Sequence, residues 1–288
     1  MDKLAFIKSV LFNDAKIISP LVGGMMNESL IVSSKNQKYV LYISTEQANE
    51  MVNRELEKEN QSLVYSLGIT SKNVYFDVQK GIKINEFIEG SSLDKISSYD
   101  INKVATLLHT LHDSGLLSKE DYLPFKRFVG YEKEANEFVN SREELYLEIR
   151  NELLKNKEYL ESQKKVLCHN DAQKSNIIKS IEDKYYLIDF EFMGNNDPIY
   201  DIATFGNATV KEGFDLLNVY SPNPSLDLKK RYYLWRMYIS LQWYNVALVK
   251  HYRGEGEIHH FNFLDVASHF LNNANDAYHG YLNLLSLL

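Results

Sequence analysis

The sequence predicts an α+β fold of two lobes, in which a small lobe with an antiparallel sheet precedes a large, mainly helical lobe. Short runs rich in β-branched and aromatic residues, separated by turns, fill residues 16–88. After residue 100 the apolar residues instead recur at the spacing of amphipathic helices. The polar, small-residue stretch Glu86–Ser92 is the best candidate hinge. We therefore expect the lobes to comprise residues 1–88 and 89–288.

The small lobe is expected to begin with a helix, because Leu4, Ile7 and Leu11 lie at helical spacing within residues 1–14. A second helix, over Asn49–Tyr65, precedes a glycine of the kind that often ends helices. The remaining apolar runs are bounded by turn residues and predict strands. These strands are Ile17–Met26, Ser29–Ser33, Lys38–Ser44, Val74–Phe76 and Ile82–Ile88.

The large lobe is expected to begin with a helix over Ile101–His112, where leucines recur at helical spacing. His109 and His112 lie one turn apart in this helix and could bind a metal ion. They lie among leucines with no third ligand nearby in the sequence, so we expect them to pack instead. Amphipathic helices are expected within Tyr131–Lys165, and a long aromatic helix over Leu226–Tyr252.

The composition is that of an ordinary soluble globular protein, with 44% hydrophobic and 25% charged residues. The net charge of −7 argues against nucleic acid as a partner, because a phosphate backbone calls for a basic surface. No apolar run reaches the roughly 18 residues that span a bilayer, and the first residues are too polar for a signal peptide. We expect a cytoplasmic protein without membrane insertion, in which the single cysteine, Cys168, is a buried thiol.

The candidate catalytic residues lie in the stretch between residues 166 and 205. The pattern H-x-D-x4-N, which contains Asp171 and Asn176, is followed by an apolar strand and then by D-F-E, which begins at Asp189. Phosphoryl transfer needs a carboxylate near the attacking hydroxyl and oxygen ligands for Mg²⁺ beside the nucleotide phosphates. Asp171 is the candidate base, and Asn176 and Asp189 are candidate metal ligands. The pattern predicts a kinase that uses ATP and Mg²⁺ and has a protein-kinase-like fold.

The same stretch reads H-N-D-x-Q-x2-N and then I-D-F-E-F-x3-N-x4-Y-D-I-A, and in this it resembles the choline/ethanolamine kinases. These enzymes share a fold with the aminoglycoside phosphotransferases. The resemblance covers most of the chain and implies a small cationic acceptor such as choline. It implies that Asp201 supports the catalytic loop, for which a helix N-cap is the alternative interpretation. Glu191 would be a further carboxylate of the metal site. Gln173 and Trp243 would help to orient the acceptor.

Candidate nucleotide-binding residues lie in the small lobe. A glycine pair between two strands lets backbone amides approach phosphate, although plain hairpins also contain such pairs. Kinases carry a glutamate on the helix after the third strand, and their hinge meets adenine through backbone groups. A solvated charged face is the alternative interpretation of the glutamate in this helix. The candidates are Gly23, Gly24, Asn27, Glu57, Glu86 and Ile88.

Some positions depart from the family pattern. The third strand of kinases carries a lysine or arginine that binds the α/β-phosphates, whereas this chain has Tyr42 there. We expect Lys174, in the catalytic loop, to substitute for it. Ala208 stands where these kinases commonly have a glutamate in the choline site, and Val246 replaces the second tryptophan of W-x2-W. Met26 stands where a threonine is common.

Three functions remain open from the sequence. The preferred one is a kinase for choline or another small amino alcohol. The second keeps the chemistry but changes the acceptor to ethanolamine, thiamine, an aminoglycoside or a sugar, which Ala208 and Val246 favour. The third is a catalytically weak or inactive kinase-like protein that binds a nucleotide or a partner. Whether a cation occupies the place of the missing lysine discriminates this third function from the others.

Overall fold

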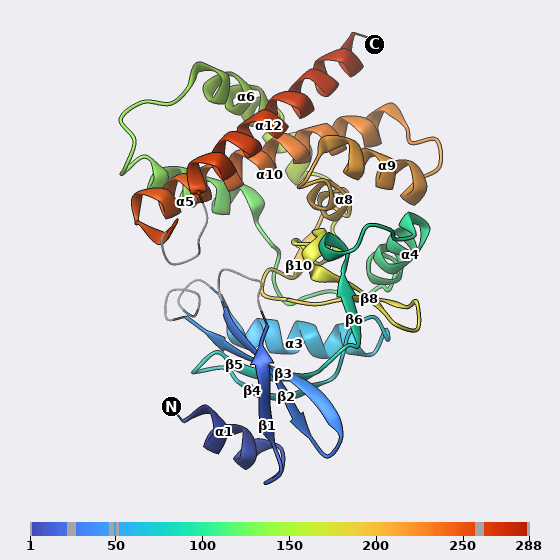
Figure 1. The fold of residues 1–288 in the computed structure, drawn as a ribbon. Helices are drawn as coiled ribbons and strands as arrows, with labels where there is room; N and C mark the ends of the chain where they lie inside the picture. Colours follow the sequence, from blue (N-terminus) through green and yellow to red (C-terminus); the bar gives the residue numbers. More distant parts are fainter. Residues whose placement is uncertain (1, 22–26, 46–48, 50–51, 257–261, 287–288) are drawn as a thin grey trace. The chain divides into compact units, whose positions relative to one another are not determined.

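The computed structural model describes residues 2–21, 27–45, 49, 52–256 and 262–286. The chain forms two compact units, each assembled from separate segments (Figure 1). One unit comprises Met1–Tyr99 and Lys174–Met193, and the other comprises Asp100–Gln173 and Gly194–Leu288. The chain therefore passes from one unit to the other within the predicted catalytic loop.

The first unit is built on a five-stranded antiparallel sheet with the strand order β1-β2-β3-β5-β4. Each strand overlaps one of the apolar runs identified in the sequence. The strands are β1 (Lys16–Pro20), β2 (Asn27–Ser34), β3 (Gln37–Ser44), β4 (Asn73–Asp77) and β5 (Ile82–Glu86). Two helices, α1 (Lys3–Val10) and α3 (Arg54–Tyr65), lie on opposite sides of this sheet (Figure 1).

The two faces of the sheet differ in chemistry. Leu41 and Ile84 are paired across β3 and β5, and both belong to an apolar cluster with Ile7 of α1. The neighbouring pair, Tyr42 and Lys83, projects to the opposite face because side chains alternate along a strand. This is the face that α3 covers, because an ion pair joins Lys83 to that helix. The pairing of β3 with β5 thus places a charged side chain beneath α3.

The segment 174–193 belongs to the first unit because its strands pair there. In a second antiparallel sheet, β8 (Ile177–Ser180) lies between β6 (Gly90–Ser92) and β9 (Tyr185–Leu187). Two 3₁₀ turns, η1 (Leu93–Lys95) and η2 (Lys174–Asn176), contact each other beside this sheet. The compact units thus divide the chain at other positions, and lobes that meet at residues 88 and 89 stay a prediction.

The second unit is mainly helical and packs around α10 (Leu226–Tyr252), most of whose residues are buried. The antiparallel pair β7 (Val166–Cys168) and β10 (Gly194–Asn196) leads into the predicted catalytic loop. The long helix α12 (Phe263–Leu285) lies along α10 (Figure 1). The other helices are α4 (Ile101–His112), α5 (Pro124–Ala135), α6 (Glu144–Lys155), α7 (Lys157–Glu161), α8 (Ile199–Phe205) and α9 (Val210–Tyr220).

In the described part of the chain, no helix combines the length and the apolar character that crossing a membrane requires.

Candidate active site

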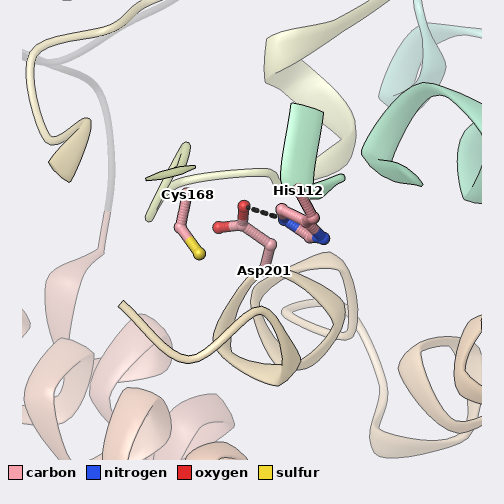
Figure 2. A group of neighbouring side chains, drawn as sticks. All are labelled: His112, Cys168 and Asp201. Carbon is pink, nitrogen blue, oxygen red and sulfur yellow. Dashed lines mark hydrogen bonds and ion pairs between the residues drawn. The ribbon is translucent and has the colours of Figure 1, made fainter. Parts of the chain in front are cut away.

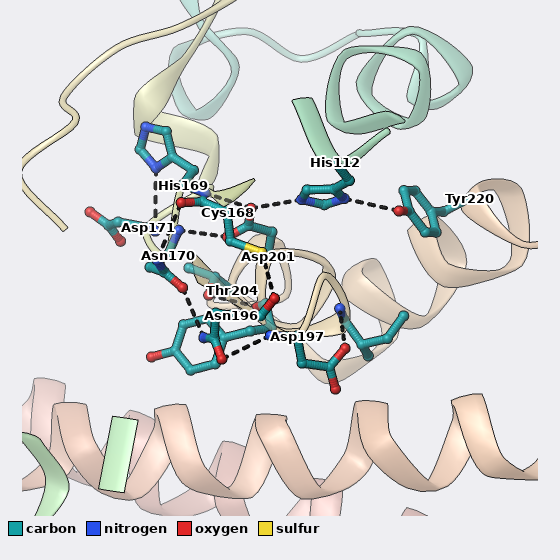
Figure 3. Close-up of polar contacts among 12 residues, drawn as sticks. His112, Cys168, His169, Asn170, Asp171, Asn196, Asp197, Asp201, Thr204 and Tyr220 are labelled. Atoms are coloured by element: carbon teal, nitrogen blue, oxygen red, sulfur yellow. Dashed lines mark hydrogen bonds and ion pairs between the residues drawn. The ribbon is translucent and has the colours of Figure 1, made fainter. Parts of the chain in front are cut away.

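The second unit holds the first half of the predicted catalytic loop through Asp201, which lies on the fully buried helix α8. Figure 3 shows this carboxylate facing the loop. Its Oδ2 accepts a hydrogen bond from the backbone N–H of His169 at 2.8 Å, and its Oδ1 accepts one from Asn170 at 2.7 Å. Hydrogen bonds to a buried carboxylate are charge-assisted and strong. Asp201 therefore fixes the backbone immediately before Asp171.

Asn170 takes an unusual conformation to make this turn. Its φ of 61° lies in the left-handed region, which asparagine tolerates better than most residues. Its side-chain amide donates to the backbone oxygens of Cys168 and Gly194 at 3.2 and 3.1 Å, and its Oδ1 accepts from Asn196 at 2.8 Å (Figure 3). These hydrogen bonds join the loop to β7 and β10 and offset the backbone strain at Asn170.

His112 extends the same network, so its surroundings differ from the leucine packing that we expected. Its Nε2 lies 2.9 Å from Oδ2 of Asp201, and its Nδ1 lies 2.9 Å from the hydroxyl of Tyr220. Cys168 and Asp201 gather with it (Figure 2), and the three possible ligand atoms lie within 4.8 Å of one another. No local pattern indicates this group, since the three residues come from three distant elements.

Hydrogen bonding rather than metal binding explains this buried group. Both oxygens of Asp201 already accept backbone N–H donors. The thiol of Cys168 donates to the backbone oxygen of Asn196 at 3.3 Å, and burial raises the pKa of this thiol well above its usual value. A protonated thiol is a poor metal ligand. The prediction that Cys168 is buried is confirmed, as its exposed fraction is 0%.

Asp171 is linked through a chain of side chains to a buried arginine. Gln173 donates from Nε2 to Oδ2 of Asp171 at 3.3 Å and accepts from Asn207 at 3.2 Å. Arg236 donates to Oδ1 of Asn207 at 2.8 Å, and its exposed fraction is 0%. Burial lowers the pKa of Arg236 to about 10, so the guanidinium still carries its charge at neutral pH. The predicted base and the predicted acceptor residue Gln173 are therefore in contact.

The first unit contains a buried cluster of charged residues on the α3 face of its sheet. Lys83 of β5 lies 2.5 Å from Oε1 of Glu57 and 3.6 Å from Oδ1 of Asp189. Glu57 also accepts from Arg54 at 2.6 Å, and Arg54 lies 3.4 Å from Glu191. Two cations and three carboxyl groups thus gather here.

The ionisation of these groups follows from their mutual contacts. Burial disfavours the ammonium of Lys83, but the carboxylates of Glu57 and Asp189 outweigh it and raise the pKa of Lys83. Burial likewise favours neutral Glu57, yet Lys83 and Arg54 hold the pKa of this carboxyl below its usual value. Burial and then the charge of Asp189 raise the pKa of Glu191 to about 8. Lys83 and Glu57 are therefore a charged pair at neutral pH, whereas Glu191 is largely protonated.

Asp189 combines a strained backbone with a carboxylate oxygen that could bind a cation. Its φ of 67° lies in the left-handed region, where a non-glycine residue is strained. Its Oδ1 is buried and accepts no hydrogen bond from the described residues; the ammonium of Lys83 lies 3.6 Å away. A carboxylate oxygen left without a donor fits Mg²⁺, which prefers oxygen ligands. The chemistry of the site thus fits the predicted metal.

Lys83 was not among the residues that we identified from the sequence. Tyr42, at the position expected for a lysine, is paired with it across the sheet, and Nζ of Lys83 lies 4.9 Å from the Tyr42 ring centroid. Lys38, on the same strand as Tyr42, instead forms an ion pair with Glu89 at 2.8 Å. The signal available in the sequence was a single lysine between apolar residues in β5. Its partner could be found only from the strand pairing.

The other predicted site residues lie in several environments. Gly23 and Gly24 lie outside the described residues. Asn27 begins β2, where its Oδ1 accepts from the hydroxyl of Ser44 at 2.9 Å. The N–H of Glu86 donates to the backbone oxygen of Lys72 at 2.9 Å.

Ile88 follows β5 and makes no backbone hydrogen bond with the residues that the structure describes. Asn176 is buried, with an exposed fraction of 8%, and Lys174 lies two residues before it in the same 3₁₀ turn. Both lie in the first unit, whereas Asp171 and Gln173 lie in the second.

The predicted acceptor residue Trp243 lies on α10 and is half-buried. Its ring stacks on Phe270 of α12, with centroids 6.0 Å apart and planes inclined by 19°. Val246, in place of a second tryptophan, is also half-buried, and Ala208 is exposed. The aromatic surface is therefore supplied by Trp243 together with a residue from another helix.

Comparison with known proteins identifies relatives over most of the chain. Residues 18–247 match the family model described as choline/ethanolamine kinase. Protein LicA of Haemophilus influenzae is 26% identical over 256 residues, which is 81% of this chain and 74% of that protein.

Solved structures show the same fold. The crystal structure of choline kinase LicA from Streptococcus pneumoniae has 25% sequence identity and a TM-score of 0.74, over 97% of each chain. A structure of LicA in complex with AMP has 25% identity and a TM-score of 0.73, over 97% of this chain and 96% of that chain. Spectinomycin phosphotransferase in complex with ADP and spectinomycin is 16% identical over 96% of this chain and 97% of that chain, with a TM-score of 0.60, which is a likeness of fold.

These matches confirm the predicted two-lobed, protein-kinase-like fold class, with a small antiparallel sheet and a mainly helical remainder. The family match covers far more than half of the chain, and the motif residues of that family occupy the loop that Asp201 supports. The chain belongs to the choline/ethanolamine kinase family, and its activity is that of a phosphotransferase with an alcohol group as acceptor.

Proposed function

We propose that the protein is a kinase that transfers the γ-phosphoryl group of ATP, with Mg²⁺, to the hydroxyl of a small amino alcohol, and that choline is its preferred acceptor. The observation that carries the proposal is the support of the loop before Asp171 by two backbone hydrogen bonds to Asp201. A base that is held in place before the substrate binds costs no reorganisation during the reaction. The choline kinase LicA and its AMP complex support the choice of acceptor and nucleotide.

Each residue of the site has a separate role in the proposed reaction. Asp171 accepts the proton of the acceptor hydroxyl while the oxygen attacks the γ-phosphorus and ADP leaves. Gln173, bonded to Asp171, holds this carboxylate and lies beside the acceptor. Asn176 and Asp189 would hold Mg²⁺, with Glu191 as a further carboxylate of that site. The ion would neutralise charge on the phosphate oxygens.

Nucleotide binding is proposed for the first unit. Gly23, Gly24 and Asn27 would border the phosphates, and the backbone between Glu86 and Ile88 would meet the adenine edge. The absence of backbone hydrogen bonds at Ile88 within the described residues leaves its N–H and C=O available for this contact. We keep Lys174 as a candidate for the γ-phosphate, since it lies in the turn that ends at Asn176.

The acceptor is proposed from the aromatic surface of the second unit. A quaternary ammonium is attracted to the face of an aromatic ring. The stacked pair of Trp243 and Phe270 supplies such a face even though Val246 replaces the second family tryptophan. The exposed Ala208, in place of a glutamate, favours a second candidate, in which ethanolamine, thiamine or an aminoglycoside is the acceptor.

The test is ADP release from ATP and Mg²⁺ with choline, ethanolamine, thiamine or kanamycin. We expect choline to give the highest kcat/KM, and Asp171→Asn to lower kcat by at least about 100-fold because general base catalysis is lost. Asp276→Asn, an exposed change on α12, serves as the matched control. A higher kcat/KM with another acceptor would establish the second candidate, and no release with any acceptor would refute the proposal for these substrates.

A further inference from the structure

We propose that Lys83, on β5, is the cation that binds the α/β-phosphates of the nucleotide, in place of the third-strand lysine that this chain lacks. The proposal rests on the proposed ATP-dependent function and adds a phosphate-binding residue to it. The lysine of this chain thus lies on the strand adjacent to the usual one, while its ammonium has the carboxylate neighbours expected of the third-strand lysine.

The register of the sheet makes this relocation possible. Tyr42 and Lys83 are directly paired in the antiparallel ladder of β3 and β5. Paired residues project to the same face, and adjacent strands are about 4.8 Å apart. A long, flexible lysine side chain that starts from β5 can therefore reach the space over Tyr42. The recorded position agrees, since Nζ of Lys83 lies 4.9 Å from the centroid of that ring.

The partners of Lys83 are those of a kinase phosphate-binding lysine. In protein kinases this lysine pairs with a glutamate of the following helix, and the aspartate of the D-F-G motif lies beside the metal ions. Lys83 pairs with Glu57 of α3 at 2.5 Å and lies 3.6 Å from Asp189 of the D-F-E sequence. The cation is therefore held between the two carboxylates that the motif predicts for this place.

Tyr42 completes the arrangement. Burial raises the pKa of Tyr42 to about 12, so its phenol stays neutral at physiological pH and does not add a competing negative charge. A ring face near an ammonium is attractive when both groups are shielded from water. Tyr42 thus places a neutral ring 4.9 Å from the ammonium of Lys83.

Other cations on this unit fit the role less well. Lys38 is exposed and is paired with Glu89 at 2.8 Å. Arg54 is buried, but its Nη1 is engaged by Glu57 of its own helix and lies 3.4 Å from Glu191. Among the described residues, Lys83 is the cation that is paired with Tyr42 across the sheet and that lies 3.6 Å from Asp189. We therefore assign the phosphate contact to Lys83 and a supporting role to Arg54.

The experiment compares Lys83→Met with Lys80→Met, which removes an exposed lysine from the same hairpin. ADP affinity is measured by titration and by the increase in Tm on ADP addition, and kinetics give KM for ATP and for choline separately. We expect Lys83→Met to weaken ADP binding by at least about 10-fold and to lower kcat/KM for ATP by about 100-fold or more. KM for choline should change by less than about threefold, and Lys80→Met should match the wild type.

A charge-conserving double variant protects the test against a folding defect. Tyr42→Lys combined with Lys83→Leu returns the lysine to β3 and keeps the net charge of the buried cluster. We expect this variant to recover at least about 10-fold of the kcat/KM for ATP that Lys83→Met loses. If the role of Lys83 is purely structural, the double variant should recover the Tm of the wild type but not its affinity for ADP.

Three results would overturn the assignment. One is equal ADP affinity in Lys83→Met and Lys80→Met. Another is loss of ADP affinity in Arg54→Gln but not in Lys83→Met, which would transfer the role to Arg54. The third is a wild-type protein that binds neither ADP nor ATP. If the wild type binds ADP but phosphorylates none of the acceptors, the proposed function fails while the assignment of Lys83 is still decided by ADP affinity.

Discussion

Asp201 shows how one buried carboxylate positions a residue that it does not touch. Its two oxygens bind the N–H groups of His169 and Asn170, so the orientation of the next residue, Asp171, is fixed through the backbone. His112 shares Oδ2, which restrains the carboxylate from the side of α4. The exposed fraction of Asp201 is 0%, so water cannot replace these bonds. Positioning of the loop therefore depends on the second acceptor oxygen of this carboxylate.

We predict that Asp201→Asn lowers both stability and turnover. One oxygen becomes an amide that faces a backbone donor, and an unsatisfied buried donor costs about 1–3 kcal/mol. We expect a lower Tm and a fall in kcat of about 10-fold or more with little change in KM for ATP. Steady-state kinetics and thermal unfolding measure both effects, with Asp276→Asn as the exposed control. An unchanged kcat would mean that Asp201 does not position Asp171.

Glu191 makes the stability of the protein depend on pH. Its side chain is 5% exposed, and burial together with the charge of Asp189 raises its pKa to about 8, from the ordinary 4.5. Between these two values the native state holds a proton that the unfolded chain has released. The unfolded state then binds fewer protons, so the free energy of unfolding contributed by this group falls as pH rises through this range.

We predict that Glu191→Gln removes this dependence. From about pH 5 to about pH 8, the Tm of the wild type should fall relative to that of the variant, and the difference should level off above about pH 9. Glu182→Gln, a change at a 70% exposed side chain, is the control and should follow the wild type at every pH. A difference in Tm between wild type and Glu191→Gln that stays constant with pH would contradict the raised pKa.

At the scale of elements, two helix glycines have opposite surroundings. Gly130 lies within α5 and is exposed, and a Cβ added there would meet no atom within 4 Å. Gly213 lies within α9 and is buried against α8. A Cβ there would lie 3.0 Å from Cα of Gly206 and 2.5 Å from the hydroxyl of Tyr232. The close approach of α8 and α9 therefore depends on the missing side chain of Gly213.

We predict opposite signs for alanine at these two positions. Gly130→Ala should stabilise the protein by about 0.5–1 kcal/mol, because alanine restricts the unfolded chain and favours a helix. Gly213→Ala gains the same propensity but forces α8 and α9 apart, and we expect a net loss of about 1–3 kcal/mol. Denaturant unfolding of both variants measures the difference. A stabilising Gly213→Ala would show that the two helices can separate without cost.

The elements themselves could be predicted from the sequence because their patterns are local. Apolar runs bounded by turn residues located the strands of the five-stranded sheet, and the leucine spacing located α4 within its observed bounds. Helix ends were less well defined: α5 begins at Pro124, ahead of the predicted helical region that starts at Tyr131. Proline in the first turn marks such a start, since its missing N–H has no partner there in any case.

At the scale of the whole molecule, the sequence predicted the motif residues but not the contacts between distant segments. Asp171 and Asp189 were identifiable because phosphoryl transfer needs carboxylates at a fixed spacing. The position of Lys83 beside Tyr42 depends on the pairing of β3 with β5, which skips β4. The bond between His112 and Asp201 joins residues 89 positions apart. No local pattern encodes such partners, and only the folded chain reveals them.

The division into units has the same origin. Residues 174–193 join the first unit because β8 pairs with β6, whose residues precede it by more than eighty positions. The hinge expected over Glu86–Ser92 was inferred from composition, which reports local flexibility rather than long-range pairing. Asp171 consequently belongs to one unit and Asn176 to the other.

Because Cys168 is buried, its chemical modification reports local opening of the structure around β7. It is the single cysteine of the chain, it ends β7 directly before the predicted catalytic loop, and its exposed fraction is 0%. A thiol-alkylating reagent attacks the thiolate, which burial suppresses here. Modification therefore requires that β7 separates from its neighbours. The rate at which the protein gains the mass of one reagent molecule reports how often this opening occurs. Because no second thiol competes, intact-mass measurement alone can follow the local opening of the strand that precedes the predicted catalytic loop.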